Sequence, residues 1–253
     1  MILDSFRLDG KVALVTGASA GLGASMAVAL AEAGANVVAH GNSRAPNATC
    51  ELIQSAGSSS LAILGDLSDK TVPRKLVAQA INHFGKLDIL INNAGTIRRA
   101  PAVDYSDADW DTVIEVNLSS VFRLSQHAGR HMTERGSGKI VNIASLLAFQ
   151  GGITVPAYAA SKGGVAQLTK ALANEWAKLG INVNAIAPGY MRTDNTAALQ
   201  ADETRNRQIL ERIPAGRWGE PKDLAGAVVF LSSAASDYLH GHVLVVDGGW
   251  MGR

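Results

Sequence analysis

Residues 11–23 read Lys11-Val12-Ala13-Leu14-Val15-Thr16-Gly17-Ala18-Ser19-Ala20-Gly21-Leu22-Gly23. The apolar start of this stretch predicts a buried strand, and the alanine-rich residues 21–33 predict a helix. Glycines between a strand and a helix let the backbone approach a pyrophosphate, and the helix N-terminus offers free N–H groups to that anion. The spacing is G-x-x-x-G-x-G, which differs from the commoner G-x-G-x-x-G fingerprint. The stretch therefore predicts a nucleotide-binding turn, with a merely tight turn as the alternative.

The same alternation of strand and helix continues to the C-terminus. Strands are predicted at 11–16, 36–40, 61–64, 87–92, 139–144, 181–187 and 243–246, and helices at 21–33, 47–56, 69–84, 107–134, 157–179 and 221–232. The strands are continuously apolar, as expected when helices cover both faces of a parallel sheet. The pattern predicts one α/β domain over residues 1–253, a Rossmann-type doubly wound parallel sheet of about seven strands.

Residues 188–218 form a polar stretch that is too long for an ordinary connection. Two short helices are predicted inside it, at 196–199 and 203–212. A long segment of this kind at the edge of a predicted ligand site suits a lid that covers the substrate.

Composition excludes several classes of partner. The chain has 253 residues and a net charge of +1, so nothing favours binding to nucleic acid or to an anionic membrane. The single cysteine, Cys50, allows no internal disulfide and is expected to be a small buried apolar residue. Residues 1–7 show no basic region followed by an apolar run, so no signal peptide is expected and the predicted location is cytoplasmic.

Tyr158 and Lys162 are four residues apart on a predicted helix, and therefore lie one turn apart on the same face. The free pKa of tyrosine is about 10, and a nearby ammonium lowers it by stabilising the phenolate. The pair could then move a proton near neutral pH, and Ser145, thirteen residues before Tyr158, could hydrogen-bond the oxygen that receives it. The alternative is an ordinary surface Tyr and Lys.

The residues after the second predicted strand should select the cofactor. An acidic residue there binds the ribose hydroxyls of NAD, whereas a basic residue suits the 2′-phosphate of NADP. This chain has Asn42, Ser43 and Arg44 and no acid, which leans slightly towards NADP. Asp66-Leu67 follows the third strand and could reach the adenine.

The motifs T-G-x-x-x-G-x-G, Asn92-Asn93-Ala94-Gly95, Asn117, Ser145, Y-x-x-x-K and Pro188-Gly189 occur in this order. In this combination the chain resembles the short-chain dehydrogenase/reductases over nearly its whole length. The resemblance implies a homotetramer that moves hydride between NAD(P) and an alcohol or carbonyl compound. It implies that Tyr158 is the acid/base, that Lys162 lowers its pKa and binds the nicotinamide ribose, that Ser145 polarises the substrate oxygen, and that Asn117 holds a water. The implied cofactor contacts are Gly17, Ser19, Gly21, Leu22 and Gly23 at the pyrophosphate, Asp66, Leu67, Asn93, Ala94 and Gly95 at the adenosine, and Pro188, Gly189 and Thr193 near the nicotinamide.

Further stretches resemble one bacterial branch of that family, which acts on sugar acids such as 2-dehydro-3-deoxy-D-gluconate, generally with NAD. They are 97–99, 149–152, 174–177, 187–191, 212–219 and Asp247-Gly248-Gly249-Trp250. The chain departs from the branch at His40–Arg44 and at Ser58–Ser60, which leaves the choice of NAD or NADP open. A general NADPH-dependent ketone or ketoacyl reductase is the alternative activity. A non-catalytic nucleotide-binding module is the alternative class, although it would not need the four catalytic residues together.

A sugar acid requires a cation for its carboxylate and polar groups for its hydroxyls. Arg98 or Arg99 is predicted to bind the carboxylate, and Gln150, Tyr190 and Trp218 are predicted to complete the substrate site. The alternative is that both arginines are solvated or lie in an oligomer contact. His127 and His131 are four residues apart, but no third ligand of suitable spacing follows, so no metal site is predicted.

Overall fold

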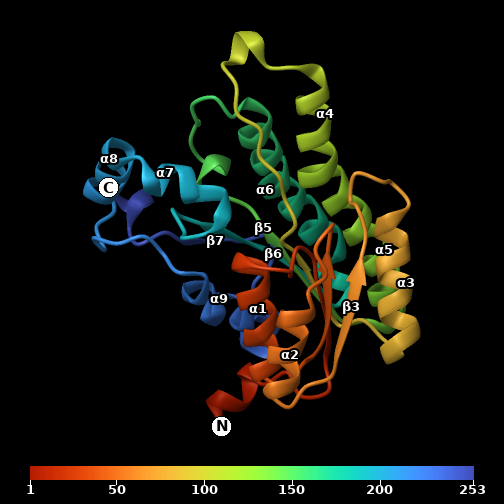
Figure 1. Cartoon of the computed structure of the whole chain (residues 1–253). Helices are drawn as coiled ribbons and strands as arrows, with labels where there is room; N and C mark the ends of the chain where they lie inside the picture. Colours follow the sequence, from red (N-terminus) through yellow and green to blue (C-terminus); the bar gives the residue numbers. More distant parts are fainter.

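Seven parallel strands form one sheet in the computed structural model, which describes residues 1–253 (Figure 1). The strands are β1 (Val12–Val15), β2 (Asn36–Gly41), β3 (Ser60–Leu64), β4 (Ile89–Asn92), β5 (Gly138–Ile143), β6 (Ile181–Pro188) and β7 (Val243–Val246). Their order across the sheet is β3-β2-β1-β4-β5-β6-β7. The order reverses between β1 and β4, and ligands bind outside the carboxyl ends of the strands at such a point. The predicted doubly wound α/β fold is confirmed.

Helices cover both faces of this sheet (Figure 1). They are α1 (Gly21–Glu32), α2 (Asn47–Ser55), α3 (Val72–Phe84), α4 (Asp107–Ile114), α5 (Ser120–Arg135), α6 (Pro156–Trp176), α7 (Ala197–Ala201), α8 (Glu203–Arg212) and α9 (Ala225–Ser232). Side chains of α1, α2 and α9 pack on one face, and side chains of α3, α5 and α6 pack on the other. None of the helices is both long and apolar enough to cross a bilayer.

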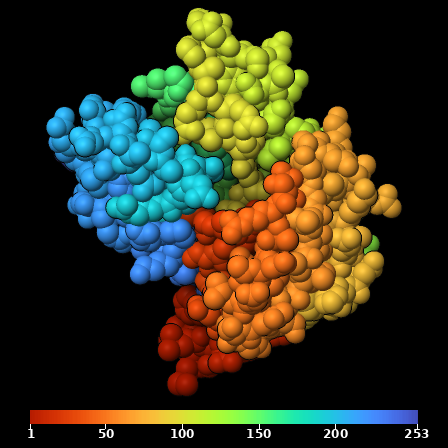
Figure 2. All heavy atoms as spheres, viewed as in Figure 1, coloured from red at the N-terminus to blue at the C-terminus, as the bar shows by residue number.

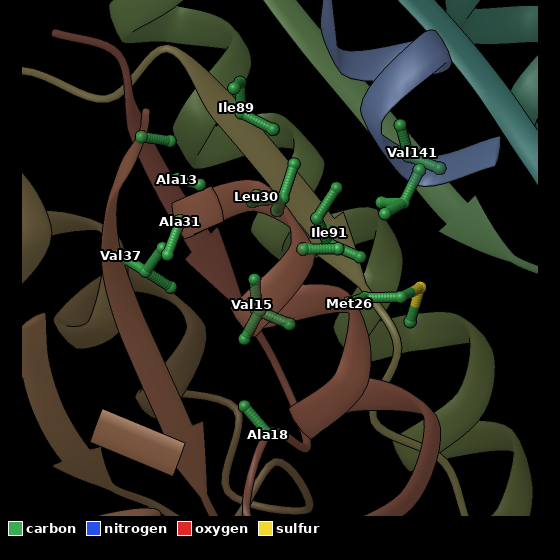
Figure 3. Close-up of a cluster of buried hydrophobic side chains, with 14 of the residues drawn as sticks. Ala13, Val15, Ala18, Met26, Leu30, Ala31, Val37, Ile89, Ile91 and Val141 are labelled. Carbon is green, nitrogen blue, oxygen red and sulfur yellow. The ribbon is translucent and has the colours of Figure 1, made fainter. Parts of the chain in front are cut away.

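Each central strand contributes side chains to both faces, because successive residues of a strand point to opposite sides. In β1, Ala13 and Val15 join the core under α1, whereas Leu14 joins the opposite core. Figure 3 shows Ala13 and Val15 packed with Leu30 of α1 and Ile91 of β4. These positions are fully buried, which explains why the strands read as unbroken apolar runs.

The structure corrects one predicted helix. Residues 107–134 were expected to form one helix, but α4 ends at Ile114 and a π-helical turn, η3 (Glu115–Ser119), separates it from α5. A π turn widens the helix by one residue and is typical of functional sites. Here it carries Asn117, which is fully buried.

The predicted lid segment contains α7 and α8, and Figure 1 shows both helices beside the C-terminal end of the chain. α8 has the predicted bounds, whereas α7 begins one residue later and ends two residues later than predicted. Residues 221–232 were also predicted as one helix, but a 3₁₀ turn, Pro221–Leu224, precedes α9. Proline is accommodated at the first position of that turn, because its missing N–H has no intrahelical partner there.

Candidate active site

Tyr158 and Lys162 lie on the first two turns of α6, which begins at Pro156. The Nζ atom of Lys162 lies 5.6 Å from the centroid of the Tyr158 ring. Lys162 is only 4% exposed, and its Nζ donates a hydrogen bond of 2.6 Å to the carbonyl oxygen of Ile143. Ile143 is the last residue of β5, so this bond fixes the lysine at the carboxyl edge of the sheet.

Burial changes the pKa of both side chains. Removal from water lowers the pKa of Lys162 to about 8. Burial raises the pKa of Tyr158, and the hydroxyl of Ser145 and the charge of Arg99 act in the opposite direction. The sequence indicated Lys162 as the cation that lowers the tyrosine pKa. In the structure the ammonium donates to a backbone carbonyl, and the charge of Arg99 also acts to lower the pKa of the phenol. The effect of Lys162 on the phenol stays a prediction.

Ser145 follows β5 directly and is the N-cap of a short 3₁₀ turn, Leu146–Ala148. Its Oγ accepts a hydrogen bond of 3.2 Å from the backbone N–H of Leu147. Ser145 and Tyr158 line the same cavity. The structure therefore brings together a phenol and a hydroxyl that can contact one substrate oxygen.

Asn117 connects the π turn to two other parts of the site. Its Oδ1 accepts from the N–H of Thr96 at 2.8 Å, and its Nδ2 donates to the carbonyl of Thr96 at 2.9 Å and to Ser161 Oγ at 3.1 Å. The side chain amide is thus committed to the chain after β4 and to α6. The water predicted at this residue stays a prediction.

The glycine-rich turn between β1 and α1 fits a pyrophosphate. Gly17 and Gly21 have φ of +66° and +58°, a conformation that favours glycine. A Cβ at Gly23 would lie 2.1 Å from the carbonyl oxygen of Gly17, so the turn is closed too tightly for any side chain there. The N-cap Ala20 provides no side-chain hydrogen bond, and the first N–H groups of α1 have no intrahelical partner. These donors are available to an anion.

Two side chains brace this turn. Asn93 Nδ2 donates to the carbonyls of Thr16 and Gly17 at 2.9 and 3.1 Å. The amide of Asn93 thus supports the glycine turn, and its predicted place beside the adenosine stays a prediction. His40 is buried, and its Nδ1 accepts from the N–H of Gly17 at 3.4 Å while Nε2 lies 2.8 Å from the carbonyl of Gly65. The ring therefore joins the pyrophosphate turn to the end of β3, and burial lowers its pKa.

The remaining predicted cofactor residues lie along the same edge. Asn42, Ser43 and Arg44 are exposed after β2, and the carbonyl of Arg44 accepts a hydrogen bond of 2.6 Å from Ser19 Oγ. Asp66 is exposed, whereas Leu67 is buried in the core under α3. A Cβ at Gly21 would lie 3.7 Å from Thr193, so this part of the predicted lid segment lies against the glycine turn.

A cavity of about 840 Å³ opens beside Tyr158. Figure 2 shows this surface hollowed between the lid, drawn in cyan and blue, and the segment near residue 100, drawn in yellow. Of the predicted substrate residues, Arg99, Gln150 and Tyr190 line the cavity. The position of Arg99 follows from a hydrogen bond of 3.1 Å from Ala100 N to the carbonyl of Thr154.

Two predicted substrate residues lie elsewhere. Arg98 is 3.5 Å from Asp109 and does not line the cavity. Trp218 is 1% exposed, and its Nε1 donates to Asn206 Oδ1 at 2.7 Å. Its ring packs edge-on against Tyr190, with 5.5 Å between centroids. Trp218 is therefore a core residue that supports Tyr190, and its assignment to the substrate site was wrong.

Several cavity residues were not predicted from the sequence. Arg205, Gln208 and Arg212 reach the cavity from α8, and Trp250 reaches it from the C-terminal turn. The polar positions 205, 208 and 212 share one face of a predicted helix, and this periodicity was the available signal.

No group of three or more His, Cys, Asp or Glu side chains is arranged to hold a metal ion. His131 instead accepts a hydrogen bond of 3.2 Å from the N–H of Leu87.

Known proteins share this arrangement. A family model of the short-chain dehydrogenase type, described as enoyl-(acyl carrier protein) reductase, matches residues 17–251. The chain is 54% identical over 254 residues to the 2-dehydro-3-deoxy-D-gluconate 5-dehydrogenase of Dickeya dadantii, with 100% of each chain covered. A solved structure from Agrobacterium tumefaciens, provisionally called a 2-deoxy-D-gluconate 3-dehydrogenase and containing NADP, is 56% identical with a TM-score of 0.93, covering 98% of this chain and 99% of that chain. A gluconate 5-dehydrogenase from Burkholderia cenocepacia, in complex with NADP and tartrate, is 41% identical with a TM-score of 0.94, and 100% of each chain is covered.

The matched residues include the glycine turn, the buried Asn117 and the Ser145, Tyr158 and Lys162 side chains described above. The family match and the full-length identity lead to one conclusion. The chain belongs to the short-chain dehydrogenase/reductase family and is an NAD(P)-dependent oxidoreductase.

Proposed function

We propose that this protein interconverts a secondary alcohol and a ketone on a keto-deoxy sugar acid such as 2-dehydro-3-deoxy-D-gluconate. The observation that carries the proposal is the cavity beside Tyr158. Three arginines line it (Arg99, Arg205 and Arg212), and no Asp or Glu does. Arginine is suited to binding carboxylates, so this lining favours an anionic substrate over a neutral ketone. Relatives named for sugar acids, at 54% and 41% identity, support the same substrate class.

The proposed cofactor site runs along the carboxyl edge of the sheet. The first turn of α1 would hold the pyrophosphate, the segment 42–44 and Asp66 would meet the adenosine, and Thr193 would lie near the nicotinamide. When bound, NAD(P) supplies a hydride to the ketone carbon or accepts one from the alcohol carbon.

The chain's own residues handle the proton. During reduction, the Tyr158 phenol donates its proton to the substrate oxygen while the Ser145 hydroxyl hydrogen-bonds the same oxygen. The positive charge of Arg99 stabilises the phenolate that remains, because an opposite charge nearby favours the ionised form. Lys162 is fixed by the carbonyl of Ile143 near the Tyr158 ring, and in this proposal it would bind the nicotinamide ribose. Alcohol oxidation follows the same path in reverse.

Steady-state kinetics against a panel of keto sugar acids, each with NADH and NADPH, tests the proposal. We expect turnover of at least one keto-deoxy sugar acid, followed at the absorbance of the reduced nicotinamide. Tyr158→Phe should abolish turnover while leaving cofactor affinity unchanged, and Tyr238→Phe, at a fully exposed position, should leave both unchanged.

Two results would contradict the proposal. Turnover of neutral ketones but not of sugar acids would indicate a general ketone reductase. Cofactor binding without turnover of any substrate would indicate a nucleotide-binding module.

The proposal includes a homotetramer that works in the cytoplasm. In this proposal helix α5, which carries the 42% exposed Phe122, forms a contact between copies.

A further inference from the structure

The outer wall of the cavity is one face of α8. Arg205, Gln208, Ile209 and Arg212 all line the cavity, at the i, i+3, i+4 and i+7 spacing of a single helix face. Such a face is normally apolar when it points into a protein. Here only Ile209 is buried, and the other three positions are polar. The helix therefore presents two cations and an amide to whatever occupies the cavity.

Arg212 is held in a defined orientation by Trp250. The guanidinium carbon lies 4.1 Å from the centroid of the indole ring, which is a cation–π contact. Trp250 is 5% exposed, and its Nε1 donates to Gln150 Oε1 at 3.2 Å. Its ring also packs against Tyr190, with 4.6 Å between centroids. The indole is thus fixed on two sides, and it leaves the edge of the guanidinium free to donate hydrogen bonds.

The C-terminal turn is fitted to the end of α8. Gly248 and Gly249 have φ of +67° and +93°. A Cβ at Gly248 would lie 2.9 Å from Ile213, and a Cβ at Gly249 would lie 3.0 Å from Pro214. Asp247 accepts hydrogen bonds from Gly249 N at 2.8 Å and from Met251 N at 2.7 Å. In the sequence Asp-Gly-Gly-Trp, the aspartate and the two glycines therefore hold the turn that places the indole of Trp250 against Arg212.

The three cavity arginines come from two segments, Arg99 from the chain after β4 and Arg205 and Arg212 from α8. Arg99 lines the cavity together with Tyr158 and Ser145, and its charge acts to lower the pKa of that phenol. A carboxylate bound there would set a negative charge beside the phenol and oppose the effect of Arg99 on its pKa. In a six-carbon acid that reacts at C5, the carboxylate carbon lies about 5 Å from the reacting carbon. None of the three arginines forms a salt bridge with a carboxylate of the protein.

We propose that Arg212, oriented by Trp250 and assisted by Arg205, is the binding site for the carboxylate of the substrate, and that Arg99 serves the reacting oxygen. The assignment deepens the proposed function and rests on it for the identity of the substrate. It makes α8 the element that selects acids over neutral alcohols. Trp250 positions Arg212 in this scheme, and it also lines the cavity beside Gln150 and Tyr190.

The first test measures tartrate binding by calorimetry with the NADP-loaded enzyme. Tartrate carries two carboxylates and occurs with NADP in a related structure. Arg212→Gln should weaken binding about 10- to 100-fold, the usual effect of losing a charge-assisted hydrogen bond. Arg207→Gln is the matched control, since Arg207 lies on α8 but does not line the cavity. Binding by Arg212→Gln within twofold of the unmodified enzyme would overturn the assignment.

The second test separates binding from chemistry. Arg212→Gln should raise KM for 2-dehydro-3-deoxy-D-gluconate by a similar factor with little change in kcat, while kcat/KM for a neutral polyol stays constant. Trp250→Leu should raise KM in the same direction, and the double variant should add little, because both changes remove one interaction. Arg212→Lys keeps the charge and should restore part of the affinity. Equal losses for acid and polyol would overturn the assignment.

The two proposals fail separately. An enzyme that binds tartrate through Arg212 but oxidises no keto-deoxy sugar acid would refute the proposed substrate and leave the anion site standing. An enzyme that oxidises this substrate with an unchanged KM in Arg212→Gln, but a raised KM in Arg99→Gln, would refute the anion site alone.

Discussion

The buried charge of Lys162 lowers the stability of the fold. Its pKa of about 8 lies well below the usual 10.5, because the buried site disfavours the charged form. The difference corresponds to about 3 kcal/mol of lost stability at neutral pH. Lys162→Met should therefore abolish turnover and raise the free energy of unfolding. The expected gain is about 1–3 kcal/mol and not the full amount, because the methionine leaves the Ile143 carbonyl without its hydrogen-bond donor. Chemical denaturation at pH 7 measures the change.

The pH dependence of this effect has a definite sign. Between about pH 8 and 10.5 the folded lysine is neutral whereas the unfolded lysine is protonated, so the unmodified protein gains stability as pH rises. The advantage of Lys162→Met should shrink over that range. Lys170→Met, at an exposed position of the same helix, should show no such trend. A constant difference between Lys162→Met and the unmodified protein from pH 7 to 10.5 would argue against a buried charge.

Arg44 tests the choice of cofactor at the level of one side chain. Its guanidinium is exposed after β2 and makes no hydrogen bond within the chain. If it meets the 2′-phosphate of NADP, Arg44→Ala should raise KM for NADPH about tenfold or more and leave KM for NADH unchanged. Arg74→Ala, on α3, is a control. Equal effects on both cofactors would show that Arg44 takes no part in the selection.

Asp88 ties three elements together at the amino edge of the sheet. It lies just before β4, and its carboxylate accepts from Val12 N at 2.9 Å and from Arg135 Nη2 at 2.9 Å. Burial acts to raise the pKa of Asp88, but these hydrogen bonds and the nearby cations hold it below its usual value. Asp88→Asn should lower the free energy of unfolding by about 2–4 kcal/mol, because Val12 N and Arg135 Nη2 lose their charged acceptor.

Acid should weaken the same junction. A carboxyl whose pKa is lowered by folding stabilises the fold above its unfolded pKa, and this contribution disappears as pH falls through the folded pKa. The unmodified protein should lose stability below about pH 4 more steeply than Asp88→Asn. Parallel curves for the two proteins would show that Asp88 does not contribute through its charge.

The regular elements were predictable because their signals are local. Strand β1 and helix α1 follow from apolar runs and glycines within about a dozen residues, and helix α8 was predicted with its observed bounds. The π turn was not predictable, because it depends on the pairing of Asn117 with Thr96, 21 residues earlier. Trp218 was misassigned for a similar reason: its partner Asn206 lies on α8, and the sequence alone does not place that helix over the indole.

The candidate site also has a part that local sequence signals predict and a part that depends on contacts between distant residues. The spacing of Ser145, Tyr158 and the glycines along the sequence indicates their chemistry. The residues of the cavity wall carry no such indication, since Arg99, Arg205 and Trp250 meet only after the whole chain is folded. The roles of Asn93 and His40 could not be predicted either. Both brace the glycine turn through hydrogen bonds that no sequence motif specifies.

At the scale of the whole molecule, the proposed tetramer makes Phe122 a test position. This exposed ring on α5 is the kind of side chain that a contact between copies would cover. Phe122→Glu should give particles smaller than four copies of the 26.4 kDa chain, as measured by light scattering after size-exclusion chromatography. Leu52→Glu, at an exposed position on α2, should leave the mass unchanged. An intact tetramer in Phe122→Glu would exclude this helix from the contact.

The π turn at Glu115–Ser119 also has an evolutionary consequence. Such a turn carries one residue more than an α-helix of the same length, so a deletion within it would leave a regular helix that still folds. Because each residue turns an α-helix by about 100°, that deletion would rotate α4 against α5 and carry the amide of Asn117 away from Thr96. Lineages that keep the chemistry are therefore expected to keep both Asn117 and the length of this turn, and to tolerate replacement at its other positions.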